Sequence, residues 1–163
     1  MKEDMPPVTL TRLKILLADD DQDDRTFFKR VVNALAVPAL LHVVENGEEL
    51  MDYLFSNTHD LPDVLFLDLN MPKKNGAECL KEIKANRKLK DLPVVIYSTA
   101  LPDGSEDCLY EVGAHYYARK TDLPGTQQIV HFIIRQLREN KLPRSIKEKF
   151  VLTPKMYNQK YLN

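Results

Sequence analysis

The sequence predicts an α/β protein built on a five-stranded, doubly wound parallel sheet. Short apolar runs of strand length alternate with longer amphipathic segments between residues 13 and 140. The runs are largely apolar, and the run at residues 13–18 is short and continuous, as expected for a strand that is buried on both faces. Strict alternation of strands and helices favours parallel strands with helices on both faces. A doubly wound sheet of this kind has the strand order 2-1-3-4-5.

Each element follows from its own residue pattern. The first strand is expected at residues 13–18 (LKILLA), and residues 23–35 follow with large apolar side chains at helical spacing. The other strands are expected at residues 40–44, 63–68, 93–98 and 116–119. The other helices are expected at residues 47–55, 77–85, 105–112 and 126–140. The last helix carries Ile129, Ile133 and Leu137 on one stripe, so we expect that stripe to cover the sheet.

The composition is that of one ordinary globular domain with a basic end. Of the 163 residues, 44% are hydrophobic and 29% are charged. The net charge of −1 gives no general attraction to nucleic acid or membranes. Residues 141–163 hold six Lys or Arg and one Glu, a local charge of +5, which leaves −6 for the first 140 residues. We therefore expect an N-terminal extension at 1–11, a domain at 12–140 and a basic C-terminal tail at 141–163.

The sequence favours a cytoplasmic location. No apolar run approaches the length of a membrane span, and the first residues lack the apolar core of a signal peptide. Cys79 and Cys108 have no C-x-x-C spacing and are expected to be reduced thiols. The histidines lack paired metal-ligand spacing and are expected to be structural or surface residues: His42, His59, His115 and His131.

Polar side chains follow four of the predicted strands at the point where each strand ends. Asp19 and Asp20 follow the first strand, and Asp68 closes the third. Ser98 closes the fourth strand, and Lys120 follows the fifth. In doubly wound sheets the carboxyl ends of the strands meet at the switch point of the strand order. We therefore expect three carboxylates, one hydroxyl and one ammonium at one edge of the sheet, where a cation could bind.

The stretch ADDDQDDR at residues 18–25 is crowded with acids that repel one another, by about 4 kcal/mol per pair at 4 Å in an effective dielectric near 20. Asp21 is placed to cap the following helix, with Asp23 and Asp24 in its first turn, where free amides and the helix dipole favour carboxylates. Arg25 is expected to be solvated. The cluster thus divides into two acids for a cation and three for the helix.

Four motifs together resemble the receiver domain of two-component response regulators. They are ADD at residues 18–20, LDLNMPKKNG at 67–76, ST at 98–99 and YARK at 117–120. The resemblance covers roughly residues 13–140, and its most specific part is the spacing of Asp68, Met71 and Pro72. It implies a flavodoxin-like (βα)5 fold with a single-domain, chemotaxis-regulator-like organisation.

The resemblance also implies a role for each strand-end residue. Asp68 would accept a phosphoryl group, Lys120 would stabilise its charge, and Ser98 with Tyr117 would form the switch. Mg²⁺ would be held by Asp19, Asp20, Asp68 and the backbone carbonyl of Asn70. The chemistry agrees, because a carboxylate is a competent nucleophile and phosphoryl transfer depends mainly on positioning and cations.

The implied function is a phosphorylation-dependent signalling switch rather than an enzyme, apart from Mg²⁺-dependent self-phosphorylation and autodephosphorylation. The donor would be the phosphohistidine of a sensor histidine kinase or phosphotransferase. The signal would pass to a downstream protein, or to self-association, through residues 105–112, 116–119 and 126–140. The 23 residues after residue 140 are too few for an output domain, and nucleic-acid binding by them is only weakly supported.

Two other functions stay open from the sequence. The family usually has Lys-Pro with a cis peptide at the end of the fifth strand, whereas this chain has Lys120-Thr121. The isomer of this bond therefore stays open. A pseudo-receiver, which is never phosphorylated, also stays open. A haloacid-dehalogenase-like phosphatase would need Asp-x-Asp-x-Thr or Val, and Asp23 stands where Thr or Val would be. An EF-hand beginning at Asp19 fails at its sixth and twelfth positions.

The basic tail has two interpretations of equal weight. It contains more apolar residues than a disordered basic segment usually has, among them Phe150, Leu152 and Met156. It could pack back on the acidic body, or it could form an arm that docks to a partner or a second copy.

Overall fold

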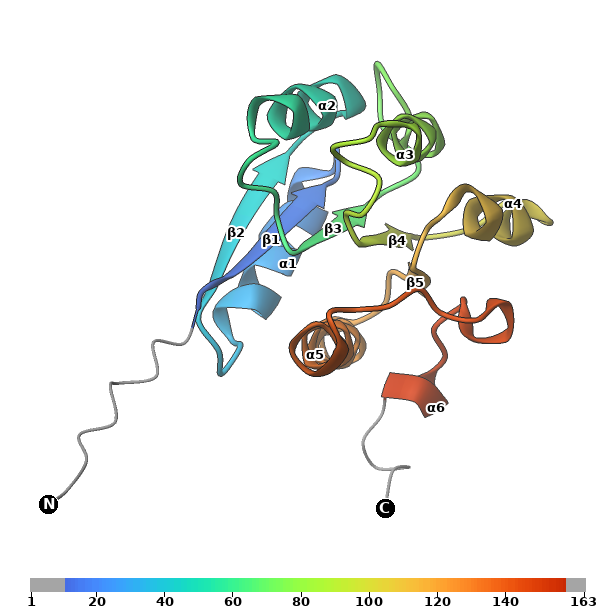
Figure 1. Cartoon of the computed structure of the whole chain (residues 1–163). Coiled ribbons are helices and arrows are strands. Elements are labelled where there is room, and N and C mark those ends of the chain that lie inside the picture. Colours follow the sequence, from blue (N-terminus) through green and yellow to red (C-terminus); the bar gives the residue numbers. More distant parts are fainter. Residues whose placement is uncertain (1–10, 158–163) are drawn as a thin grey trace, which may run out of the picture.

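A computed structural model, which describes residues 11–157, contains five parallel strands in the order β2-β1-β3-β4-β5 (Figure 1). The strands are β1 (Leu13–Ala18), β2 (Ala39–Val44), β3 (Val64–Leu67), β4 (Val94–Ser98) and β5 (Tyr116–Arg119). The predicted fold class, strand order and strand positions are confirmed, with boundaries that differ by one residue at most.

Helices cover both faces of the sheet (Figure 1). One face carries α1 (Gln22–Asn33) and α5 (Leu123–Asn140), and the other carries α2 (Gly47–Ser56), α3 (Gly76–Ala85) and α4 (Ser105–Val112). The fifth helix begins at Leu123, three residues before the predicted start at residue 126. Asp122 caps it by accepting from the Gly125 N–H, and Pro124 supplies a preset φ in its first turn.

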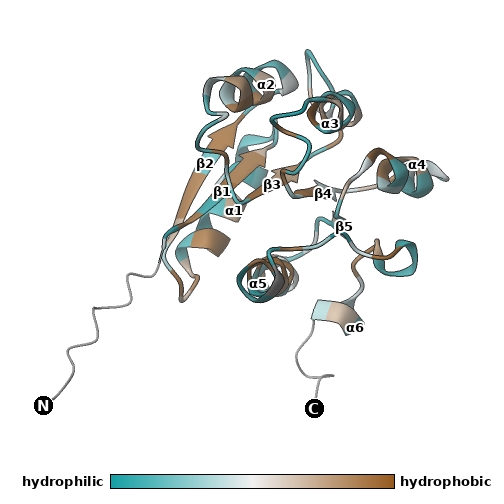
Figure 2. Cartoon of the chain, viewed as in Figure 1, coloured by the Kyte–Doolittle hydropathy of each residue, from teal (hydrophilic) through white to brown (hydrophobic). Residues whose placement is uncertain are grey.

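The largely apolar runs of the strands divide between two cores. Successive side chains of a strand point to opposite faces. Leu16 and Ala18 of β1 therefore join the core under α2, α3 and α4, whereas Ile15 and Leu17 join the core under α1 and α5. Figure 2 shows the result as hydrophobic strands flanked by helices with one hydrophobic and one hydrophilic side. The central strands β3 and β4 are buried along their whole length, so their polar site residues lie at the strand ends.

The chain beyond α5 packs back on the domain. Lys141 and Leu142 adopt φ values of 58° and 51°, which reverses the chain after the helix. The segment then forms η1 (Lys147–Lys149) and α6 (Pro154–Tyr157). Leu142, Phe150 and Leu152 are all buried. For residues 142–157 the structure therefore shows the packed alternative, and residues 158–163 lie outside the described residues.

The same segment pairs with β5. The Tyr117 N–H donates to the Phe150 carbonyl at 2.9 Å, and the Leu152 N–H donates to the Tyr117 carbonyl at 2.8 Å, which places Val151 beside Tyr117 in a parallel bridge. An exposed edge strand would present unpaired backbone groups, so this bridge satisfies part of the edge. One exposed ion pair, Lys147 with Asp107 at 3.2 Å, adds little. Apolar burial and backbone pairing thus hold residues 142–152 on the domain.

The remaining predictions concern single residues. Cys79 is buried, Cys108 is exposed, and both are free thiols. His42 stacks on Tyr53, with ring centroids 4.2 Å apart. In the part of the chain that the structure describes, no helix has the length and apolar character that crossing a membrane requires.

His115 is expected to make the fold sensitive to acid. It is 7% exposed, its Nδ1 accepts from the Val94 N–H at 3.3 Å, and burial, with Lys84 and Arg144 nearby, lowers its pKa to about 3. The unfolded chain binds a proton near pH 6.5 and the folded chain does not, so the stability from neutral His115 is present above pH 6.5 and is lost as the pH falls toward 3. We expect His115 to contribute a loss of about 2 kcal/mol of unfolding free energy between pH 7.5 and 5, read as the difference between the wild type and a variant without this imidazole.

The measurement is urea unfolding across this pH range for the wild type and for His115→Asn, which keeps an acceptor near the Val94 N–H. The variant should lack this acid-dependent loss. Parallel pH profiles for the two proteins would contradict the assignment to His115.

Candidate functional site

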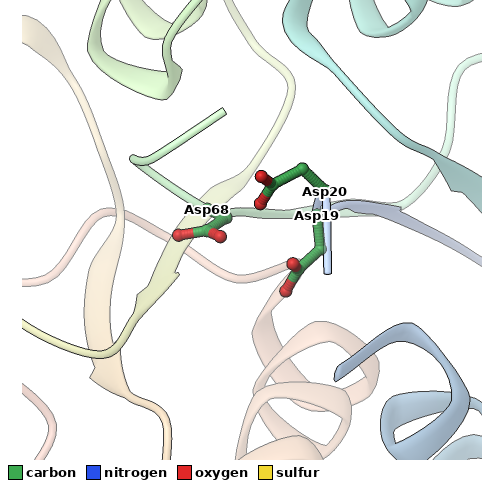
Figure 3. Close-up of side chains that lie close together, drawn as sticks. All are labelled: Asp19, Asp20 and Asp68. Atoms are coloured by element: carbon green, nitrogen blue, oxygen red, sulfur yellow. The ribbon is translucent and has the colours of Figure 1, made fainter. Parts of the chain in front are cut away.

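Three carboxylates meet at the carboxyl ends of two neighbouring strands. Asp19 and Asp20 follow β1, and Asp68 follows β3 (Figure 3). One carboxylate oxygen from each residue lies within 4.8 Å of the others. Asp19 and Asp68 are buried, whereas Asp20 is exposed. The structure thus brings together the acids that the sequence predicted, at the switch point between β1 and β3.

Backbone hydrogen bonds fix the two buried aspartates. The Asp68 N–H donates to the Ala18 carbonyl at 3.0 Å, and the Asp19 N–H donates to the Val44 carbonyl at 3.1 Å, so both residues continue the sheet pairing. Asp19 Oδ1 also accepts from the Asp21 N–H at 3.0 Å. These bonds hold the carboxylates on the rigid part of the fold.

Asp21 caps α1 as predicted, since its side chain accepts from the Asp24 N–H at 2.9 Å. The expectation that Arg25 is solvated is wrong. Its side chain is 16% exposed, its guanidinium donates to the Asp19 carbonyl at 3.0 Å, and it pairs with Glu45 at 3.2 Å. Arg25 lies in the first turn of α1, and its side chain folds back to the end of β1, where it contacts the Asp19 carbonyl. No spacing rule in the sequence indicated this contact.

Lys120 reaches the acids from the end of β5. Its Nζ lies 2.7 Å from Asp19 Oδ2, 2.8 Å from Asp24 Oδ2 and 3.2 Å from Asp68 Oδ2. Burial opposes its charge, but the close contacts of its ammonium with the carboxylates of Asp19 and Asp24 outweigh burial and raise the pKa of Lys120 above its ordinary value. The described residues contain no cis peptide bond, so the Lys120-Thr121 bond is trans. The trans bond leaves the lysine in reach of the site.

Asp19 is the least satisfied group of the cluster. Burial raises its pKa to about 6, although contacts with Lys120 and the Asp21 N–H act in the other direction. Among the described residues, its Oδ2 is the buried side-chain oxygen that lacks a hydrogen-bond partner of good geometry. A buried oxygen of this kind beside two further carboxylates suits a divalent cation with oxygen ligands. The residues therefore fit a divalent metal.

The other predicted site residues surround Asp68. The Ser98 hydroxyl, fully buried, donates to Asp68 Oδ1 at 3.0 Å. The Asn70 N–H approaches the same oxygen at 3.4 Å. The Tyr117 side chain is 5% exposed, and its hydroxyl lies 3.5 Å from the Ser98 carbonyl. Tyr117 thus connects the site to the bridge with the C-terminal segment.

Asp24 is the site residue that sequence reasoning assigned elsewhere. Its position in the first turn of α1 was explained by the helix alone, yet its side chain contacts Lys120 across 96 residues of sequence. Predicting this contact requires knowing that Lys120, at the end of β5, reaches the first turn of α1. Charge spacing along the chain carries no such information.

Comparisons with known proteins agree with this geometry. The family model described as response regulator receiver domain matches residues 15–130. Response regulator Rcp1 of Synechocystis sp. is 32% identical over 112 residues, which is 66% of this chain and 76% of that protein. The chemotaxis protein CheY homolog of Campylobacter jejuni is 30% identical over 118 residues, covering 72% of this chain and 86% of that protein.

Solved structures lead to the same family. The phosphorylated cyanobacterial phytochrome response regulator RcpA has a TM-score of 0.69 and 33% identity, covering 78% of this chain and 94% of that one. The Mn²⁺-bound form of Rcp1 has a TM-score of 0.67 and 27% identity, covering 82% of this chain and 97% of that one. Five parallel strands in the receiver order, the acidic cluster and a family match over residues 15–130 show that the chain belongs to the response regulator receiver domains, a family of phosphorylation-dependent signalling switches.

Proposed function

We propose that this chain accepts a phosphoryl group on Asp68 from the phosphohistidine of a sensor histidine kinase or phosphotransferase. The proposal rests on the groups around the Asp68 carboxylate. Two acids, one ammonium and one hydroxyl lie close to it, and they come from three other strand ends. An Asp68 oxygen forms a bond to phosphorus as the phosphorus–nitrogen bond of the donor breaks. The ring nitrogen keeps the electron pair of the broken bond and the ring carries one proton from solvent, so the products are an acyl phosphate on Asp68 and a free imidazole on the donor.

Each neighbouring residue has a role in this proposal. Asp19, Asp20, Asp68 and the Asn70 carbonyl would hold Mg²⁺, which when bound supplies positive charge for the transferring oxygens. The Lys120 ammonium, already 3.2 Å from Asp68, would contact a phosphoryl oxygen. A trans Lys120-Thr121 bond is compatible with this contact, so the departure from Lys-Pro gives no separate support to a pseudo-receiver.

The proposed output begins at Ser98. Its hydroxyl now donates to Asp68, and after transfer it would donate to the phosphoryl group instead. Because the Tyr117 hydroxyl lies beside the Ser98 carbonyl, a shift of Ser98 changes the space that Tyr117 occupies. The resulting difference would be presented by α4, β5 and α5 to a downstream protein or a second copy. Only two arrangements of these elements are needed for such a switch.

We further propose that residues 12–140 act as the receiver domain and residues 141–163 as an accessory tail, in the cytoplasm. The first donor to test is a phytochrome-type histidine kinase. RcpA, a cyanobacterial phytochrome response regulator, is 33% identical, and the bacteriophytochrome response regulator RtBRR is 26% identical.

The proposal predicts one Mg²⁺-dependent phosphoryl adduct after incubation with acetyl phosphate, detected by intact mass. Hydroxylamine should remove the adduct, EDTA present during the incubation should prevent its formation, and Asp68→Asn should not form it. Asp52→Asn, an exposed aspartate of α2, is the matched control and should keep the adduct.

Three other outcomes would contradict the proposal. An equal adduct on Asp68→Asn would place the phosphoryl group elsewhere. The absence of any adduct, under conditions that modify a known receiver, would favour a pseudo-receiver. Steady turnover of general phosphomonoesters would favour a phosphatase.

A further inference from the structure

The ion pair between Lys120 and Asp24 joins the site to a carboxylate that the acidic cluster does not contain. The cluster of oxygens within 4.8 Å of one another consists of Asp19, Asp20 and Asp68. Asp24 approaches from α1, with Oδ2 at 2.8 Å from Lys120 Nζ. Its side chain is 40% exposed, whereas that of Lys120 is 10% exposed. Asp24 therefore contacts the lysine without belonging to the candidate metal ligands.

The position of Asp24 is set by a short series of hydrogen bonds that starts at the site itself. Asp19 Oδ1 accepts from the Asp21 N–H at 3.0 Å, and Asp21 Oδ1 accepts from the Asp24 N–H at 2.9 Å. The Asp24 side chain then accepts from Lys120 Nζ. The end of β1, the cap of α1 and the end of β5 are thereby connected in one closed loop of contacts.

We propose that Asp24 is a positioning residue that holds the Lys120 ammonium over Asp68 for phosphoryl transfer. The proposal rests on the proposed roles of Asp68 and Lys120. A lysine side chain loses much rotamer freedom when it is held in one geometry, and a second anchor lowers the fraction of conformers in which the ammonium is misplaced.

The arrangement of charges explains why Asp24 suits this task. A cation bound to Asp19 and Asp68 would draw on the same oxygens that now contact Lys120. Asp24 would remain as the carboxylate partner that the cation does not share. The ammonium would then stay near the site instead of being repelled from it. The nearby Tyr97 ring, with its centroid 5.7 Å from Lys120 Nζ, offers a weaker attraction on the same side.

The test compares Asp24→Asn with Asp24→Glu and with Asp23→Asn. Asp23 is an exposed acid in the same first turn of α1, and no contact with Lys120 is found for it among the described residues. It controls for the loss of one negative charge and for effects on the helix. Circular dichroism and thermal unfolding establish that each variant is folded before it is used.

Two readouts separate positioning from a merely structural role. The first is the rate of phosphorylation by acetyl phosphate with Mg²⁺, where Asp24→Asn should lose about fivefold to tenfold, Asp23→Asn less than about twofold, and Asp24→Glu should recover most of the loss. The second is acylation of Lys120 in metal-free protein, followed by peptide mass spectrometry. Asp24→Asn should raise the labelling rate about threefold, because a lysine with one anchor fewer samples solvent-exposed conformers more often.

The outcomes distinguish this proposal from the proposed function. Equal phosphorylation rates for Asp24→Asn and Asp23→Asn, with a normal wild type, would overturn the positioning role and leave the function intact. Faster phosphorylation of Asp24→Asn would also overturn it, because Asp24 would then compete for the lysine. A wild type that takes no phosphoryl group would overturn the function and this role together.

Discussion

Phe150→Ala is expected to lower the free energy of unfolding by about 3–5 kcal/mol, although Phe150 lies outside the five βα units. The ring is 2% exposed and packs edge-on against Tyr110, with centroids 5.5 Å apart. The carbonyl of the same residue accepts the Tyr117 N–H at 2.9 Å. Truncation thus leaves a cavity in the core under α4 and weakens a segment that pairs with β5.

The matched control is Ile146→Ala in the same segment. Ile146 is 58% exposed, and its truncation should change the unfolding free energy by less than about 0.5 kcal/mol. Urea unfolding of both variants at one pH measures the difference. Similar small losses for the two variants would show that the C-terminal segment contributes little to the fold.

The oligomeric state of Phe150→Ala decides what the packed segment is for. If the segment serves the fold of its own chain, the variant should keep the mass of the wild type in light scattering while losing stability. A change from dimer to monomer with little loss of stability would support the alternative of a dimer-forming arm. The experiment therefore tests both interpretations of the tail that the sequence left open.

The fold could be predicted from the sequence because each strand is a short, largely apolar run and each helix has one apolar stripe. Those patterns indicate which side chains are buried, and strands buried on both faces are typical of a parallel sheet with helices on both sides. The tail was harder to predict. Phe150 and Leu152 indicated that the segment is partly apolar. The pairing of Val151 with Tyr117, however, depends on the path that the chain takes after it reverses at Lys141 and Leu142.

The candidate site was predicted where chemistry and topology coincide, and missed where only tertiary structure supplies the contact. Asp19, Asp68 and Lys120 stand at strand ends, so the strand order alone brings them together. Asp24 and Arg25 stand inside a helix, where a charged residue has an adequate local explanation. Their contacts with Lys120 and with the Asp19 carbonyl follow from the docking of α1, which no local pattern encodes.

Gly76→Ala should have the largest combined effect on fold and site. Gly76 begins α3, where alanine is ordinarily favoured over glycine by about 1 kcal/mol. A Cβ there would lie 2.1 Å from the Asp68 carbonyl oxygen and 2.8 Å from the Leu69 Cα, and both are backbone atoms. Overpacking of this kind costs about 1–3 kcal/mol. With a backbone clash at the upper end of that range and the gain from alanine subtracted, we expect a net loss of about 2 kcal/mol in unfolding free energy.

The same substitution should also disable the phosphoryl acceptor. The backbone that must move carries Asp68, and a displacement of about 1 Å near reacting groups can cost a factor of about 100 in rate. Gly104→Ala is the control. Gly104 has a φ of 79°, and among the described residues no neighbouring atom lies within 4 Å of the position that a Cβ would take. Alanine there costs about 1–2 kcal/mol in conformation and displaces no neighbour.

The two glycine variants should therefore distinguish the effect of backbone strain, expected in Gly104→Ala, from the effect of displacing Asp68, expected in Gly76→Ala. Both lose stability in urea unfolding, but only Gly76→Ala should lose phosphorylation by acetyl phosphate, by about 100-fold. A Gly76→Ala protein with the wild-type rate would mean that α3 moves away and Asp68 stays in place. Loss of the reaction in both variants would mean that lowered stability alone disables the site. The expected pattern would instead tie the reactivity of Asp68 to the close approach of α3 that glycine permits.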